Sequence, residues 1–226
     1  MCKRLLVIEA HSDDSAIGAY GLIQKLIGEG YEAHFMAVAM SDLDMMHCGH
    51  VSAKQRMSEY ETYVERMGGQ IVEGFTPFDA ESRMDTVPRR DVVSALERSI
   101  YSVRPDLLIC QAPSFHHDHS IVYEATIAAL RPTVRFHPDE VLLMENPTYV
   151  HSVGPSTDFK PTTYCVLSEQ AMTEKIDCFL SCFPSQLRSR ENCLSPAGIR
   201  SWAKYRALEC YAGEYAEAFV SYLRRV

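Results

Sequence analysis

Three features that would define common protein classes are missing from this sequence. No apolar run approaches the roughly 20 residues that a membrane-spanning helix needs; the run Leu5–Ile8 is typical of those present. No Cys-x-x-Cys pair occurs among the eight cysteines. Basic residues are too few to balance acidic ones, with 22 Lys and Arg against 30 Asp and Glu and a net charge of −8. These absences argue against a membrane protein and against a protein that binds nucleic acid by neutralising phosphates.

The amino terminus also lacks the pattern of a secretory signal. Lys3 and Arg4 precede an apolar run, but Glu9, His11 and Asp13 follow where an apolar signal core would continue. We therefore expect a cytoplasmic protein. In that compartment the cysteines are expected to be reduced thiols rather than disulfides.

Short apolar runs alternate with segments of helical periodicity along all 226 residues. Strands are predicted near 5–8, 35–40, 72–75, 107–110, 141–144 and 164–167. Helices are predicted near 19–27, 53–67, 88–103, 121–129, 169–183 and 197–222. Strands that alternate with helices indicate a mostly parallel sheet with helices on both faces. We expect one α/β domain spanning residues 1–226.

Polar clusters follow two of the predicted strands. His11–Asp14 comes after Leu5–Ile8, and His116–His119 comes after Leu107–Cys110. In an open parallel sheet, ligands bind beyond the carboxyl ends of the strands, so we expect the clusters to meet. Imidazole and carboxylate groups suit a divalent first-row metal ion. Because two adjacent aspartates cannot easily bind one ion, one ligand and one base is the simpler division.

Each cluster also has a plain structural explanation. Asp13 and Asp14 could cap the helix that begins near Ser15, and the histidine-rich run could be a solvated loop. Two such clusters at equivalent strand ends favour the metal site over both explanations.

Several motifs, taken in order, resemble the LmbE-like (PIG-L) family of zinc-dependent N-deacetylases. Ala10–Ser15 resembles the family's Ala-His-Pro-Asp-Asp-Glu signature, and His116–His119 resembles its His-Pro-Asp-His segment. Arg56–Glu59, Pro184–Gln186 and Gly213–Phe219 are similar to the family's Arg-x-x-Glu, His-x-Ser-Gln and Gly-x-x-Tyr-Ala-Glu-x-Phe elements. The resemblance implies a Rossmann-like three-layer sandwich. It also implies removal of an N-acetyl group from an amino sugar or a small sugar conjugate.

The resemblance further implies a metal site and a set of partners. By position in the motifs, the zinc ligands would be His11, Asp14 and His119. The bound metal could be Fe²⁺ instead of Zn²⁺, and the protein could form a homo-oligomer. The expected partner is a small N-acetylated molecule, with neither nucleic acid nor membrane involved.

Catalytic roles carry over in the same way. Asp13 would act as general base and then as general acid. His116, positively charged and oriented by Asp118, would stabilise the oxyanion that develops. Arg56 falls where the family has an arginine that contacts substrate.

Departures from the family pattern keep other readings open. Ser12, Ser15 and His117 replace the family's Pro, Glu and Pro, so which of the three histidines at 116, 117 and 119 binds metal is left undecided. The segment His47–His50 has no counterpart in the pattern and is expected to border the site. Two alternatives remain: a catalytically silent small-molecule-binding protein, and a metal-dependent hydrolase of a non-sugar ester or amide. Glu145 and Asp79 are further candidates for substrate contacts.

Overall fold

A computed structural model describes residues 2–149, 159–188 and 192–225. Seven strands form the main sheet in the order β5-β2-β1-β6-β7-β9-β8. All neighbouring strands are parallel except β9, which runs antiparallel to both β7 and β8. The strands are β1 (Arg4–Glu9), β2 (Glu32–Ala37), β5 (Gln70–Ile71), β6 (Leu107–Gln111), β7 (Glu140–Met144), β8 (Thr163–Leu167) and β9 (Tyr215–Arg224).

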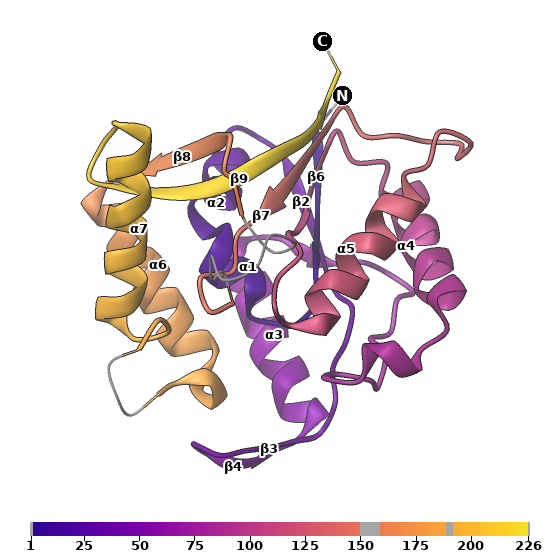
Figure 1. The fold of residues 1–226 in the computed structure, drawn as a ribbon, viewed down its shortest axis with the longest axis horizontal. Coiled ribbons are helices and arrows are strands. Elements are labelled where there is room, and N and C mark those ends of the chain that lie inside the picture. The colour runs from indigo at the N-terminus through magenta and orange to yellow at the C-terminus, as the bar shows by residue number, and fades with distance from the viewer. Residues whose placement is uncertain (1, 150–158, 189–191, 226) are drawn as a thin grey trace.

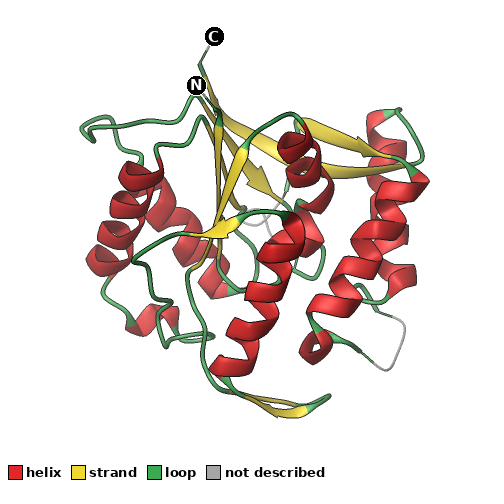
Figure 2. Ribbon diagram, turned by 180° about the vertical axis from the view of Figure 1, so that it is seen from behind, coloured by secondary structure: helices red, strands yellow, loops and turns green. Residues whose placement is uncertain are grey.

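Helices cover both faces of this sheet, which confirms the predicted α/β fold (Figures 1 and 2). One face carries α4 (Arg89–Val103) and α5 (His117–Ala129). The helices of the other face are α1 (Asp14–Gly18), α2 (Tyr20–Gly28), α3 (Ala53–Met67), α6 (Glu169–Cys182) and α7 (Pro196–Cys210). Two short 3₁₀ helices are η1 (Met84–Thr86) and η2 (Pro184–Gln186). Within the described residues, no helix is long and apolar enough to cross a membrane.

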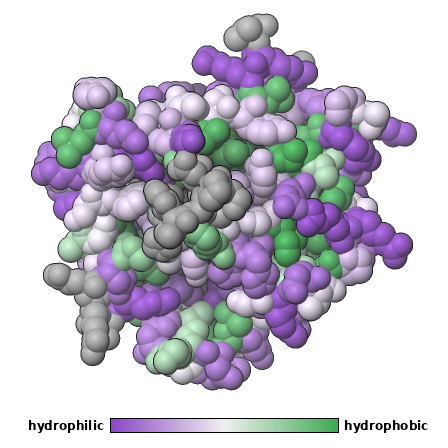
Figure 3. Space-filling view, in the orientation of Figure 1, coloured by the Kyte–Doolittle hydropathy of each residue, from purple (hydrophilic) through white to green (hydrophobic). Residues whose placement is uncertain are grey.

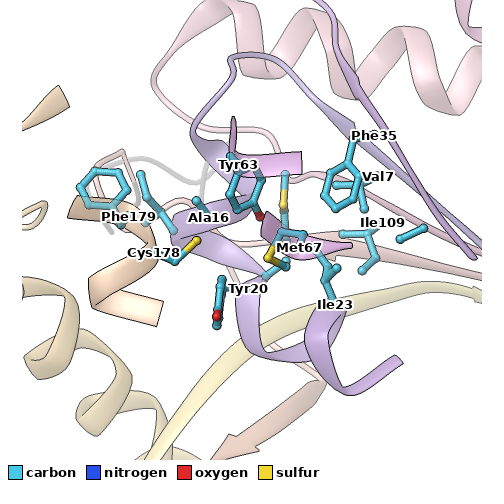
Figure 4. Packing of buried hydrophobic residues seen from close by; sticks show 14 of the residues in the cluster. Val7, Ala16, Tyr20, Ile23, Phe35, Tyr63, Met67, Ile109, Cys178 and Phe179 are labelled. Atoms are coloured by element: carbon cyan, nitrogen blue, oxygen red, sulfur yellow. The ribbon is translucent and has the colours of Figure 1, made fainter. Parts of the chain in front are cut away.

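The apolar sequence of β1 follows from its place in the sheet. Leu5–Ile8 is fully buried because helices pack against both faces. Val7 and Ile109 belong to the core shared with α1, α2, α3 and α6, where Tyr63 and Phe179 also pack (Figure 4). Strands β1 and β6 pair directly, with Leu5 opposite Leu107. The residues that follow these two strands therefore leave the sheet side by side.

The end of the chain differs from the prediction. We expected a helix over 197–222, but α7 ends at Cys210 and Tyr215–Arg224 forms strand β9. Tyr211 and Gly213 have φ values of 56° and 69°, which stop the helix and turn the chain. The first five residues of β9 are buried, because the strand lies between β7 and β8 and α7 packs against it.

Smaller differences concern boundaries. β2 ends at Ala37 rather than continuing to residue 40, and β5 is Gln70–Ile71 rather than 72–75. The predicted helix over 19–27 is α2, and the short α1 precedes it after a break at Ala19. Gly18 is required there, since a Cβ atom at this position would lie 2.2 Å from the Glu145 carbonyl oxygen.

A two-stranded hairpin projects from one end of the molecule (Figure 1). Strands β3 (Leu43–Met45) and β4 (Gly49–Val51) form it, and the unusual His47–His50 segment runs from the turn between them into β4. Ser52 then caps α3 by accepting a hydrogen bond from the Gln55 amide. The hairpin thus connects β2 to α3 and extends beyond the carboxyl end of the sheet.

Candidate active site and metal centre

The two polar clusters lie together at the carboxyl ends of β1 and β6. His119 Nε2 of one cluster lies 3.3 Å from His11 Nδ1 of the other. Asp14 completes a triangle, with Oδ1 3.5 Å from His119 Nε2 and Oδ2 3.7 Å from His11 Nδ1. All three side chains are buried. The structure therefore brings together the three residues expected to bind metal.

These distances suit a tetrahedral metal site. Bonds of about 2.1 Å from a zinc ion to nitrogen and oxygen ligands place the ligands about 3.4 Å apart. The three donor-to-donor distances of 3.3, 3.5 and 3.7 Å lie close to that value. Two histidines and a carboxylate also form the donor set of non-haem Fe²⁺ sites. The residues present fit a divalent ion of either kind.

Each of the three donors is oriented by a further contact. His11 Nε2 donates to Asp118 Oδ2 at 3.0 Å, which leaves Nδ1 directed at the triangle. His119 Nδ1 bonds the Ser114 hydroxyl at 2.8 Å, which leaves Nε2 free. Asp14 accepts from the Asn146 side-chain amide at 2.7 Å. Such contacts fix ring tautomers and raise ligand basicity in known metal sites.

The position of Asp118 corrects one expectation. We expected it to orient His116, but its carboxylate accepts from His11 and from the Ser82 and Met84 amides, at 2.6 and 3.1 Å. The reason is that Ser82, just before η1, and Met84, the first residue of η1, lie against the first turn of α5, where their amides bond Asp118. Ser82 adopts φ 61°, an uncommon value for a residue other than glycine, at this point.

The electrostatics of the site favour a cation. Burial alone would lower the pKa of His11, but the hydrogen bond to Asp118 and the charge of Asp14 raise it to about 9. Burial raises the pKa of Asp14 to about 6. Both pKa values are raised because several carboxyl groups lie close together in a buried region that little water reaches. A bound divalent cation would relieve that repulsion.

His116 and His117 lie outside the triangle that His119 completes. His116 faces the cavity beside the triangle, and its ligand nitrogen lies within 4.8 Å of those of His11 and His119. Burial and the neighbouring His11 lower the pKa of His116 to about 4, which disfavours the positively charged form that we expected. The His117 side chain is 51% exposed and lies near Asp118 and Asp85.

Asp13 lies at the edge of the triangle and lines a cavity of about 300 Å³. It occupies the N-cap position of α1, yet its side chain makes no capping hydrogen bond. A helix cap therefore does not account for it. Its carboxylate lies near Asp14 and lines the cavity.

Arg56 also lines this cavity, but a carboxylate already neutralises it. Its guanidinium forms a buried ion pair with Glu81 at 2.8 Å and a longer bond to the Ser12 hydroxyl at 3.4 Å. The Arg56 Nε atom is buried and has no partner among the described residues. Glu81 was not predicted, since it lies in an irregular loop without periodicity. Asp79, which was predicted, is exposed and pairs with Arg83.

After the end of β7, Asn146 lies in the site, rather than the predicted Glu145. Glu145 was a candidate for a substrate contact, but it is buried away from the cavity against Arg206 and Trp202. Asn146 lines the cavity instead and holds Asp14. Successive residues of a strand point to opposite sides, so a shift of one residue exchanges the two.

Beneath the site, Glu9 is a fully buried carboxyl group that sequence reasoning missed. It accepts hydrogen bonds from the Ser15 amide and the Tyr60 hydroxyl, both at 2.8 Å. Burial raises the pKa of Glu9 to about 8. Glu9 thereby ties the start of α1 to α3.

Replacing Asp118 with Asn should weaken zinc binding about 10- to 100-fold, as loss of such supporting contacts does elsewhere. An Asn side chain cannot accept from both the Ser82 and Met84 amides and from His11 at once. Competition with a chelating dye measures the affinity, and Asp85→Asn on the nearby surface is the control. Unchanged zinc affinity in Asp118→Asn would contradict this arrangement.

The fold and the buried donor set define an α/β protein with a candidate metal centre at the carboxyl edge of its sheet. Residues 6–130, more than half of the chain, match the sequence model of the family described as "PIG-L: GlcNAc-PI de-N-acetylase". The chain belongs to this PIG-L (LmbE-like) family.

Individual relatives are more distant. A diacetylchitobiose deacetylase of Thermococcus kodakarensis is 25% identical over 178 residues, which cover 74% of this chain and 64% of that protein. The match thus spans less than two thirds of the curated relative.

Solved structures share the fold over nearly the whole chain. The N,N'-diacetylchitobiose deacetylase of Pyrococcus horikoshii superposes with a TM-score of 0.74 and 19% identity, covering 97% of this chain and 84% of the other. The 4-carboxy-2-hydroxymuconate hydratase GalB of Pseudomonas putida KT2440 gives a TM-score of 0.76 and 18% identity, with 99% and 98% covered.

Proposed function

We propose that this chain is a metal-dependent N-deacetylase that acts on an N-acetylated amino sugar or a small conjugate of one. The observation that carries the proposal is the triangle of His11, Asp14 and His119 next to a cavity that Asp13 also lines. The deacetylases among its relatives support the choice of reaction.

Metal and base divide the chemistry between them. A zinc or ferrous ion held by the three donors would activate water and polarise the acetamide carbonyl. Asp13 is positioned to take a proton from the attacking water. The same carboxyl group then returns the proton to the leaving nitrogen, because an amide nitrogen must be protonated to depart as an amine.

Two further side chains complete the site. A neutral His116 lines the cavity and can donate a hydrogen bond to the oxygen on which negative charge develops. Arg56, fixed by Glu81, offers a rigid wall against which a substrate can be oriented.

The test is removal and restoration of metal. We expect the purified protein to contain about one equivalent of zinc or iron and to release amine from N-acetylglucosamine or N,N'-diacetylchitobiose. Chelation should abolish the release, and Zn²⁺ or Fe²⁺ should restore it. Full activity after complete metal removal would overturn the proposal, whereas ligand binding without product would favour a silent binding protein.

A second candidate is metal-assisted addition of water to a carbon–carbon double bond, the type of reaction named for the hydratase of the same fold. Arg188 favours it, since this cavity-lining arginine has no carboxylate within 4 Å among the described residues and suits an acidic substrate. Loss of ultraviolet absorbance from an unsaturated dicarboxylic acid, assayed beside amine release, separates the two reactions.

A further inference from the structure

Two arginines line the cavity, and they differ in how their charge is balanced. Arg56 is buried and paired with Glu81. Arg188 is half-buried, and no carboxylate of the described chain lies within ion-pair distance of it. A guanidinium in this situation is a natural partner for a planar anionic group, which it can bind through two parallel hydrogen bonds.

Arg188 is presented from a well-anchored turn. It follows η2, where Ser185 donates from its amide and hydroxyl to Glu59 on α3, at 3.1 and 2.5 Å. The guanidinium itself donates to the Gln186 carbonyl oxygen at 2.9 Å and contacts the His47 ring. These contacts hold the group at the cavity and use only part of its donor capacity among the described residues.

The net charge of the residues that line the cavity also favours an anionic ligand. Among the described residues that line it, the carboxylates are Asp13, Asp14 and Glu81, against two guanidinium groups. When a divalent ion is bound and the histidines are neutral, one positive charge remains uncompensated. A substrate with one anionic group would neutralise the cavity.

Apolar side chains line the hairpin side of the cavity beside His47. Leu43, Met45 and Met46 line it there, and Leu194 lines it from the segment before α7. Hydrophobic groups are visible among polar ones at the end of the molecule where the hairpin projects (Figure 3). Among the described residues of this wall, none carries a carboxylate or guanidinium group, so we assign recognition of a substrate's charge to Arg188.

We propose that Arg188 makes the cavity selective for substrates that carry a carboxylate or phosphate group in addition to the N-acyl group. The reaction in this inference rests on the proposed function, whereas the preference for an anionic group does not. His47 is a positioning residue that contacts the guanidinium from the hairpin. A neutral sugar would leave the Arg188 charge without a partner in a partly desolvated place, which disfavours its binding.

The experiment compares a neutral probe with two anionic ones on the zinc-loaded protein. The probes are N-acetylglucosamine, its 6-phosphate, and N-acetylmuramic acid, which carries a carboxylate. We expect kcat/KM for at least one anionic probe to exceed that of the neutral one by about 10- to 150-fold, the range for hydrogen bonds to charged groups. The better anionic probe identifies the group that is bound.

Variants of Arg188 test whether this residue causes the preference for anionic probes. In Arg188→Gln the ratio of kcat/KM for the preferred anionic probe to that for the neutral probe should fall toward one, and Arg188→Lys should keep part of the preference. Arg98→Gln, an exposed arginine that lines a different pocket, is the matched control. Equal rates for all probes in the wild type, or equal losses for all probes in Arg188→Gln, would overturn the proposal.

Binding measurements separate this inference from the proposed function. If no probe releases amine, the deacetylase proposal fails, and calorimetry with the same probes then decides the charge preference. Tighter binding of an anionic probe in the wild type, lost in Arg188→Gln, would support it. Equal binding of anionic and neutral probes, or no binding of either, would contradict it.

Discussion

Replacement of Asp13 by Asn is expected to lower kcat by about 10²- to 10⁴-fold, the usual contribution of a positioned general base. Asn is similar in size but cannot accept a proton from water or return one to the leaving nitrogen. Asp13 lies outside the His11–Asp14–His119 triangle, so zinc content should be unchanged. Amine release and elemental analysis of the same samples measure both quantities.

The control for Asp13 is Asp79→Asn, an exposed aspartate that forms no part of the cavity. It should retain the wild-type kcat. A kcat within threefold of wild type in Asp13→Asn would remove the proton-transfer role. Loss of zinc from that variant would instead place Asp13 among the ligands.

The second large effect concerns stability rather than chemistry. Replacement of Glu145 by Ala should lower the free energy of unfolding by about 3–5 kcal/mol, because it leaves Arg206 buried without its main partner. Glu145 is 3% exposed and accepts from Arg206 Nε at 3.0 Å and from Trp202 Nε1 at 2.8 Å. Urea denaturation measures the change.

A partly exposed neighbour provides the control for Glu145. Glu209 also pairs with Arg206, at 2.6 Å, but its side chain is 34% exposed. Glu209→Ala should therefore cost about 1 kcal/mol or less. The combination Glu145→Leu with Arg206→Met should recover much of the lost stability, since apolar side chains of similar volume can replace a buried pair. A loss below 1 kcal/mol in Glu145→Ala would show that Arg206 reaches solvent without it.

Periodicity predicted the sheet and the location of the site for a physical reason. Leu5–Ile8 and Leu107–Cys110 are apolar because helices cover both faces of β1 and β6, and that burial is visible in a single sequence. Once two neighbouring parallel strands are recognised, the rule on their carboxyl ends brings His11 and His119 together. Distances between side chains did not enter that prediction.

Strand β9 was not predictable in this way. Ala216, Glu217 and Ala218 favour helices by intrinsic propensity, and they continue a segment that is helical up to Cys210. In the structure, Glu217 is buried, accepts from the Gly21 and Leu22 amides at the start of α2, and pairs with Lys175 at 2.8 Å. Those partners are distant in sequence, and tertiary contacts override local preference at this strand.

The partners within the site were hidden for a similar reason. That Asp118 serves His11 rather than His116 depends on amides from the loop before η1, which no local pattern connects to α5. Glu81 and Asn146 reach the cavity from an irregular loop and from a strand end. Residue types suggested the chemistry, whereas the orienting contacts required the assembled chain.

The placement of β9 also sets the order in which the molecule can assemble during synthesis. It follows β7 and β8 along the chain, yet in the described sheet it is the strand that lies between them. While residues 215–224 are still inside the ribosomal exit tunnel, β7 exposes an unpaired edge and β8 has no neighbour to bond. A nascent chain at that stage is open to edge-to-edge aggregation. Completion of the sheet therefore waits until β9 has left the tunnel and can pair with both strands.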